Sequence, residues 1–184
     1  TMEEIITEPI KTNGKLPIKE IEKRFLRLAA LTRLPASAGK KYPHQFSGGE
    51  RQRIGIARAL ALDPEFIVCD EPVSSLDVSI QAQILNLLKE LQENLNITYL
   101  FISHDLSVVE FMSDEVAVMY KGKIIEIAGN EELFKNPLHP YTKCLLQSIP
   151  IPDPKKSHEP FPDEIEDFPV FPLKEVKPHH FAAL

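Results

Sequence analysis

Three features are scarce or missing in this 184-residue chain. The cysteines number two, Cys69 and Cys144, which is too few for a disulfide framework, so we expect a reduced cytoplasmic setting. No apolar run approaches the roughly 18 residues of a membrane-spanning helix, and we expect no secretory leader. An excess of basic residues is also missing, because the formal net charge is −6. This balance argues against nucleic acid as a general partner.

Glycine and proline divide the chain into two parts of different composition. No glycine follows Gly129, whereas ten of the sixteen prolines lie between Pro137 and Pro178. From about residue 155 the pattern is acidic and interrupted by proline, which predicts an extended or poorly ordered tail. The composition therefore indicates a boundary near residue 130.

A pair of glycines precedes a predicted helix over residues 50–62. Gly48 and Gly49 follow Ser47, and two consecutive glycines allow backbone N–H groups to approach a ligand closely. The N-terminus of the helix behind them is a natural site for an anion. Taken alone, a Ser-Gly-Gly tripeptide is more often a flexible turn. The assignment of an anion site to this tripeptide therefore depends on motifs elsewhere in the chain.

An apolar run that begins at Phe66 ends in two adjacent carboxylates, Asp70 and Glu71. This pattern is typical of a buried parallel strand that delivers acids to the carboxyl edge of a sheet, where ligands bind in open α/β folds. Asp70 suits Mg²⁺, which prefers oxygen ligands. Glu71 is placed to orient or deprotonate a water molecule. The competing interpretation is a polar end to an ordinary strand.

The next elements alternate between helix and strand. Residues 79–94 carry the clearest amphipathic helical pattern, and residues 98–102 form an apolar run that ends shortly before His104. Such alternation predicts a parallel α/β sheet. A lone histidine is usually structural or merely exposed, but at the carboxyl end of a neighbouring parallel strand it can reach the carboxylates of residues 70 and 71.

In this order, four segments resemble motifs of the nucleotide-binding subunit of ATP-binding-cassette (ABC) transporters. They are the signature loop as FSGGERQR, the Walker B strand as FIVCDE, the D-loop as SSLD and the switch histidine in FISHD. The resemblance implies the second half of a RecA-like P-loop NTPase core, of the α/β class with a parallel sheet. It also implies a small α-helical subdomain and a proline-rich C-terminal extension.

The resemblance divides the chain into three predicted parts. Residues 1–49 are the helical subdomain ending in the signature loop, and residues 50–130 are the RecA-like core. Residues 131–184 are the C-terminal extension, with the tail from about 155 poorly ordered. The sequence NPLHPYT at residues 136–142 is similar to the extension of the oligopeptide/dipeptide importer branch.

The resemblance also implies ligands and roles for particular residues. The expected cofactors are ATP and Mg²⁺, with Asp70 holding Mg²⁺ through water. Glu71 and His104 are the expected catalytic residues. The other residues expected at the nucleotide are Ser47, Gly48, Gly49, Glu50 and Asp77. Glu50 stands where the family more often has glutamine, and it brings a negative charge near phosphate unless it caps its own helix.

One expected motif is absent: G-x-x-x-x-G-K-[ST], the Walker A loop that cradles phosphates, occurs nowhere in the 184 residues. Because most contacts to ground-state phosphates come from that loop, we expect the chain alone to be inactive. We therefore interpret the sequence as the C-terminal part of a longer subunit.

The function that the resemblance implies is coupling of ATP hydrolysis to uptake of peptides or a related small solute by an ABC importer. The implied partners are a second ABC ATPase subunit, identical or different, and membrane permease subunits. The implied location is peripheral, on the cytoplasmic face of the membrane. Two alternatives stay open: an inactive fragment that serves only as an interaction module, and an ABC ATPase of DNA repair or translation.

Two further metal sites are not expected in the C-terminal part. Some members of the importer branch carry a cysteine cluster for iron–sulfur here, but this part of the chain has only Cys144. We therefore predict no iron–sulfur cluster. The neighbouring histidines His179 and His180 lack evident partner ligands in the sequence and do not predict a metal site.

Overall fold

The computed structural model describes residues 1–14, 16–148 and 171–184. The chain forms two compact units, Thr1–Ile102 and Ser103–Leu184, which we call unit 1 and unit 2. The boundary between them falls inside the predicted core of residues 50–130. The three-part division by function stays a prediction. Among the described residues, no helix is both long and apolar enough to cross a membrane.

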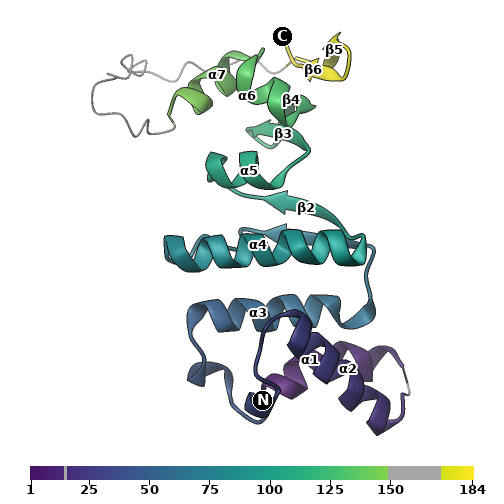
Figure 1. Cartoon of the computed structure of the whole chain (residues 1–184). Helices are drawn as coiled ribbons and strands as arrows, with labels where there is room; N and C mark the ends of the chain where they lie inside the picture. Colours follow the sequence, from purple (N-terminus) through teal and green to yellow (C-terminus); the bar gives the residue numbers. More distant parts are fainter. Residues whose placement is uncertain (15, 149–170) are drawn as a thin grey trace. The chain divides into compact units, whose positions relative to one another are not determined.

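Unit 1 begins with a group of helices and short helical turns. Its elements before the first strand are α1 (Met2–Asn13), α2 (Ile18–Leu31), η1 (Ala36–Ala38), η2 (Pro43–Gln45), α3 (Gly48–Ala59) and η3 (Leu60–Leu62). In Figure 1, α3 lies between α4 (Val78–Leu95) on one side and the pair α1 and α2 on the other. The α3 helix is therefore the central element of the helical part of unit 1.

A local signal explains the start of α1. Thr1 caps the helix through a reciprocal capping box with Glu4. Pro9, a residue that usually ends or kinks a helix, lies inside α1, which continues to Asn13. Ile6 and Ile10 are buried on either side of this proline. Burial of the apolar stripe thus outweighs the hydrogen bond that proline removes.

Two parallel strands complete unit 1. The strands β1 (Phe66–Asp70) and β2 (Thr98–Ile102) pair in register from Phe66 opposite Thr98 to Asp70 opposite Ile102. The predicted stripe of α4 is core, since Ile84, Leu87, Leu88 and Leu91 are buried. The Tyr99 hydroxyl donates a hydrogen bond of 3.1 Å to the Leu88 carbonyl, which places α4 on one face of the sheet.

The opposite face of this two-stranded sheet is apolar and exposed. Phe66 and Val68 on β1 are 55% and 54% exposed, and Leu100 and Ile102 on β2 are 50% and 45% exposed. The register places all four side chains on one face, because residues two apart point to the same side. Parallel sheets are normally covered on both faces. The described residues of unit 1 thus leave one face of a parallel sheet uncovered.

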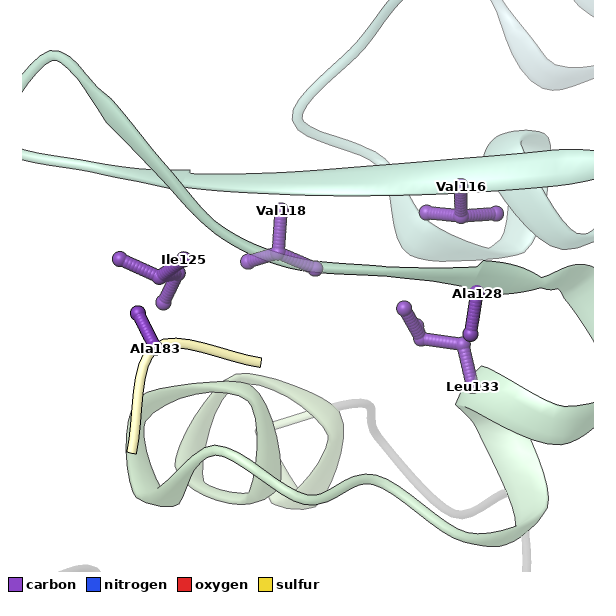
Figure 2. Packing of buried hydrophobic residues seen from close by; sticks show 6 residues of the cluster. All are labelled: Val116, Val118, Ile125, Ala128, Leu133 and Ala183. Atoms are coloured by element: carbon purple, nitrogen blue, oxygen red, sulfur yellow. The ribbon is translucent and has the colours of Figure 1, made fainter. Parts of the chain in front are cut away.

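Unit 2 is built on an antiparallel sheet with the strand order β3-β4-β6-β5. Its elements are α5 (Leu106–Met112), β3 (Glu115–Tyr120), β4 (Lys123–Gly129), α6 (Asn130–Lys135), α7 (Pro140–Gln147), β5 (Lys174–Lys177) and β6 (His180–Ala182). Figure 2 shows the core of this unit, where side chains of β3, β4 and α6 meet Ala183 from the end of the chain. The core cluster comprises Val116, Val118, Ile125, Ala128, Leu133 and Ala183.

A two-residue turn at Lys121 and Gly122 joins β3 to β4 in a hairpin. Lys121 and Gly122 both have positive φ, of 47° and 76°, as a two-residue turn matching the twist of the strands requires. The C-terminal strands differ from expectation. Residues 155–170 of the predicted tail lie outside the described residues, but residues 174–182 form a β-hairpin instead of an extended segment.

Candidate functional site

The start of α3 is closed by a capping box in which Ser47 is the N-cap. The backbone N–H and the hydroxyl of Ser47 donate to Glu50 Oε2 over 2.8 and 2.9 Å, and the Glu50 N–H donates to Ser47 Oγ over 3.3 Å. The first of these bonds is the main reason that the pKa of Glu50 is lowered. Glu50 therefore caps its own helix, which begins two residues earlier than predicted.

The two glycines at the start of α3 differ in their surroundings. A Cβ added to Gly49 would lie 2.5 Å from Cγ2 of Ile80 on α4, whereas one on the exposed Gly48 would lie 3.3 Å from Leu76. Only a glycine fits at position 49, because the two helices approach so closely there. Gly49 thus has a packing role that explains it without a ligand. Gly48 is the glycine available to an anion at the helix N-terminus.

The carboxylates of Asp70 and Glu71 lie at the carboxyl end of β1, and both residues are exposed. Glu71 has a left-handed backbone with φ of 45°, which is uncommon for a residue other than glycine. Its N–H donates to the Ile102 carbonyl over 2.9 Å, so the turn continues the pairing of β1 with β2. Exposed carboxylates of this kind suit a hydrated hard cation such as Mg²⁺.

Asp77 caps α4. Its Oδ1 accepts hydrogen bonds from the Ile80 N–H over 3.0 Å and from the Ser79 hydroxyl over 2.7 Å. The bond from Ile80 is the largest cause of the lowered pKa of Asp77. Since Gly49 packs on Ile80, the starts of α3 and α4 lie side by side. The structure therefore brings the predicted residues Ser47, Gly48, Gly49, Glu50 and Asp77 into one region of unit 1.

His104 belongs to unit 2, in the segment between β2 and α5, and its side chain is exposed. The next residue, Asp105, caps α5 by accepting from the N–H groups of Ser107 and Val108. This capping explains why the chain turns from strand to helix directly after His104. The expectation that His104 reaches the carboxylates of residues 70 and 71 stays a prediction.

Sequence reasoning missed a buried polar cluster in unit 2. It found no evident partner for His180, yet His180 is 1% exposed and its Nε2 lies 2.7 Å from Oε1 of Glu126, which is 0% exposed. The two residues are 54 positions apart, so no local pattern reveals the pair. The available signal was a glutamate in the apolar run of residues 124–128, where a charge needs a partner.

Comparisons with known proteins agree with the motif assignment. The family model described as "ABC transporter" matches residues 4–74, and the model described as "Oligopeptide/dipeptide transporter, C-terminal region" matches residues 125–168. The first match includes the signature loop and the Walker B strand, and the second includes NPLHPYT. Each part of the chain thus matches the family that its own motifs suggest.

Curated relatives carry matching names. The oligopeptide transport ATP-binding protein OppF of Bacillus subtilis (strain 168) is 53% identical over 170 residues, which are 89% of this chain and 56% of OppF. The oligopeptide transport ATP-binding protein AppF of the same organism is 58% identical over 151 residues, which are 82% of this chain and 46% of AppF. The chain thus spans about half the length of these relatives.

A solved structure supports the fold. It is described as cbiO1 from Clostridium perfringens, part of the ABC transporter complex cbiONQ, and it superposes with a TM-score of 0.64 at 32% identity. The match covers 72% of this chain and 51% of that one. The predicted α/β class with a RecA-like core is thereby confirmed. The chain belongs to the ABC transporter family, in the branch of the oligopeptide and dipeptide transporters.

Proposed function

We propose that this chain supplies the signature loop, the Walker B carboxylates, the D-loop and the switch histidine of an ATPase subunit. This subunit couples ATP hydrolysis to the uptake of peptides or a related small solute. The observation that carries the proposal is the region around Ser47, where the exposed start of the 12-residue helix α3 lies beside the segment that ends in Asp77.

The start of α3 fits a phosphate group. Gly48 is exposed, and the helix dipole favours a negative charge at this end. Ser47 is also exposed, and its donors bind the Glu50 carboxylate. In our proposal a γ-phosphate held by the opposite subunit replaces that carboxylate. The side chain of Glu50 then turns away towards solvent.

The remaining roles in ATP hydrolysis fall to Asp70, Glu71, His104 and Asp77. Asp70 binds Mg²⁺ through water, and Glu71 orients and deprotonates the attacking water. When bound, Mg²⁺ neutralises charge on the phosphates. His104 contacts the γ-phosphate and the attacking water. Asp77 transmits the state of one nucleotide site to the other across the dimer. Positioning and electrostatic stabilisation account for most of the catalysis of such a transfer.

The partners follow from the same proposal. A second ABC ATPase subunit, identical or different, faces the start of α3, and permease subunits bind the assembled pair. The location is peripheral, at the cytoplasmic face of the membrane. The names of the curated relatives support transport of oligopeptides as the process.

Substitution of Glu71 tests the proposal in the complete subunit, assembled with its permease. Glu71→Gln keeps the shape of the side chain but removes the base. We expect ATP turnover to fall by at least about 100-fold, the lower end of what general-base catalysis contributes, while ATP still holds the dimer together. Turnover is measured by phosphate release, and dimerisation by size-exclusion chromatography with ATP.

The matched control is Glu65→Gln, which removes a charge just before the other end of β1 and should leave turnover unchanged. Unimpaired turnover in Glu71→Gln would remove Glu71 from the proposed role. Loss of the ATP-held dimer in the same variant would show that the side chain acts in binding instead.

A second candidate function is that of an interaction module without ATPase activity. The exposed apolar face that Phe66, Val68, Leu100 and Ile102 form favours it, because such a face needs a protein segment to cover it. Both candidates expect the 184-residue chain alone to bind little ATP, so the test adds the remaining part of the subunit. ATP turnover in that mixture supports the ATPase subunit, and ATP binding without turnover supports the interaction module.

A further inference from the structure

A single buried carboxylate joins two distant segments of unit 2. Glu126 on β4 is 0% exposed, and its oxygens accept hydrogen bonds from the N–H groups of Leu138 and His139 over 2.7 and 3.0 Å. Both N–H groups belong to the NPLHPYT segment, residues 136–142, whose last three residues begin α7. We call this segment the 136–142 loop. Glu126 also accepts from the C-terminal hairpin, because Nε2 of His180 lies 2.7 Å from its Oε1.

A second carboxylate makes the same kind of bridge. On α6, Oε2 of Glu132 accepts from Nδ2 of Asn136, the first residue of the 136–142 loop, over 2.8 Å. Its Oε1 pairs with Nζ of Lys177 in the hairpin at 2.9 Å and lies 3.6 Å from Nδ1 of His180. His180 therefore sits between two carboxylates, and each of them contacts both the hairpin and the loop.

Apart from these contacts, the hairpin is attached through a short antiparallel pairing of β6 with β4, at Glu126–Ala182 and Ile127–Phe181. The Ala183 N–H also donates to the Ile125 carbonyl over 2.8 Å. All four residues of β5 are exposed, and β6 is only three residues long. Two short side chains supply its fully buried apolar surface, Ala182 and Ala183, each 1% exposed. Figure 2 shows Ala183 against Ile125 at the edge of the core. Because alanine buries little area, the attachment rests mainly on the polar contacts of His180 and on this short backbone pairing.

We propose that residues 171–184 are a detachable strap, and that its attachment through His180 to Glu126 fixes the conformation of the 136–142 loop. With the strap attached, Glu126 is fully paired and holds the N–H groups of Leu138 and His139. With the strap detached, Glu126 becomes accessible to water and its hold on the loop weakens. Any partner that binds the loop in its ordered form then also favours attachment of the strap, because the coupling is reciprocal.

The proposal does not depend on ATPase activity. It concerns the structure of unit 2 alone, so its test and the test of Glu71 can fail independently. The family model for the C-terminal region ends at residue 168, before the strap begins. The strap is thus a feature of this chain that the family match does not describe.

Hydrogen–deuterium exchange of the full 184-residue chain tests the coupling. In His180→Ala, we expect the amides of Leu138 and His139 to exchange about tenfold faster, together with those of residues 171–184. His180→Gln retains a donor that can reach Glu126, so it should restore part of the protection in both segments. Lys177→Ala removes only an exposed contact and should have a smaller effect.

His179→Asn is the matched control. His179 is the exposed neighbour of His180 and has a left-handed backbone that asparagine tolerates. It should leave both segments unchanged. Fast exchange of the strap with unchanged exchange at residues 138 and 139 would overturn the coupling. Loss of protection throughout β3 and β4, in His180→Gln as well as His180→Ala, would show that the strap cannot detach separately, and would also overturn the proposal.

Discussion

The carboxylates of Glu50 in unit 1 and Glu126 in unit 2 both accept hydrogen bonds from backbone N–H groups, and they differ in their access to solvent. Glu50 in unit 1 is partly exposed and closes the start of α3, whereas Glu126 in unit 2 is completely buried. Both have a lowered pKa. Water can replace Glu50 when it leaves Ser47, whereas Glu126 is fully buried while the strap is attached.

The comparison suggests what holds each region together. At the start of α3, close packing of Gly49 on Ile80 fixes the geometry, and our proposal therefore has another anion replace the carboxylate of Glu50. At Glu126 the hydrogen bonds themselves fix the geometry. A site that must accept and release a ligand benefits from the first arrangement, and a contact that fixes one segment of the chain through another benefits from the second.

The largest expected effect follows from Glu126→Ala. Removing this carboxylate leaves two N–H groups and an imidazole buried without their acceptor. We expect unit 2 to lose about 3 kcal/mol of stability, the scale of breaking a buried polar pair. Urea unfolding followed by a probe confined to unit 2 measures the loss.

The loss of stability at low pH provides a second test of the role of Glu126. Burial raises the pKa of Glu126, but the Thr142 hydroxyl, the Leu138 N–H, His180 and the His139 N–H together lower it below its ordinary value of 4.5. A lowered folded-state pKa contributes stability that is present above 4.5 and is lost as pH falls through the folded value. That loss should be smaller in Glu126→Ala. An equal loss in the variant would assign the acid sensitivity to other groups.

A middle-sized effect is expected from Gly49→Ala. The added methyl group meets Ile80 Cγ2 at 2.5 Å, so α3 and α4 must shift apart, at a cost of about 2 kcal/mol. Thermal unfolding measures it. Gly55→Ala is the control, because a Cβ at Gly55, also on α3, meets nothing within 4 Å. That variant should gain about 0.5–1 kcal/mol from the higher helix propensity of alanine. Equal effects at the two positions would contradict the packing argument.

The smallest effect is expected from Glu50→Ala. Loss of the capping carboxylate should cost about 0.5–1 kcal/mol, because water replaces it at the donors of Ser47. In the complete subunit the same change should strengthen ATP-dependent dimerisation, since the charge that competes with phosphate is gone. Analytical ultracentrifugation with and without ATP measures this. Weaker dimerisation would mean that Glu50 assists the nucleotide instead of competing with it.

Local patterns predict much of unit 1. The bounds of β2 and the burial of the stripe on α4 follow from short apolar runs and helical periodicity, and both are confirmed. The capping role of Glu50 was one of two options left by its position, three residues after Ser47. These features depend on residues close in sequence, where period and capping rules apply.

Features that depend on residues far apart in the sequence were not predicted. The strap lies in a proline-interrupted segment with no strand pattern, and its strands exist because β4 offers an edge and Glu126 offers an acceptor. Gly49 was interpreted as a ligand-binding glycine because Ile80, the side chain that requires it, lies 31 positions away in the chain. The predicted approach of His104 to Asp70 and Glu71 is likewise non-local.

The uncovered face of β1 and β2 has a consequence for handling the isolated chain. Phe66, Val68, Leu100 and Ile102 form an apolar surface on a parallel pair of strands, the kind of surface through which separate molecules adhere. We expect light scattering to rise with concentration while the helical circular dichroism signal stays constant. Soluble yield should therefore depend less on thermal stability than on how soon after synthesis this face is covered.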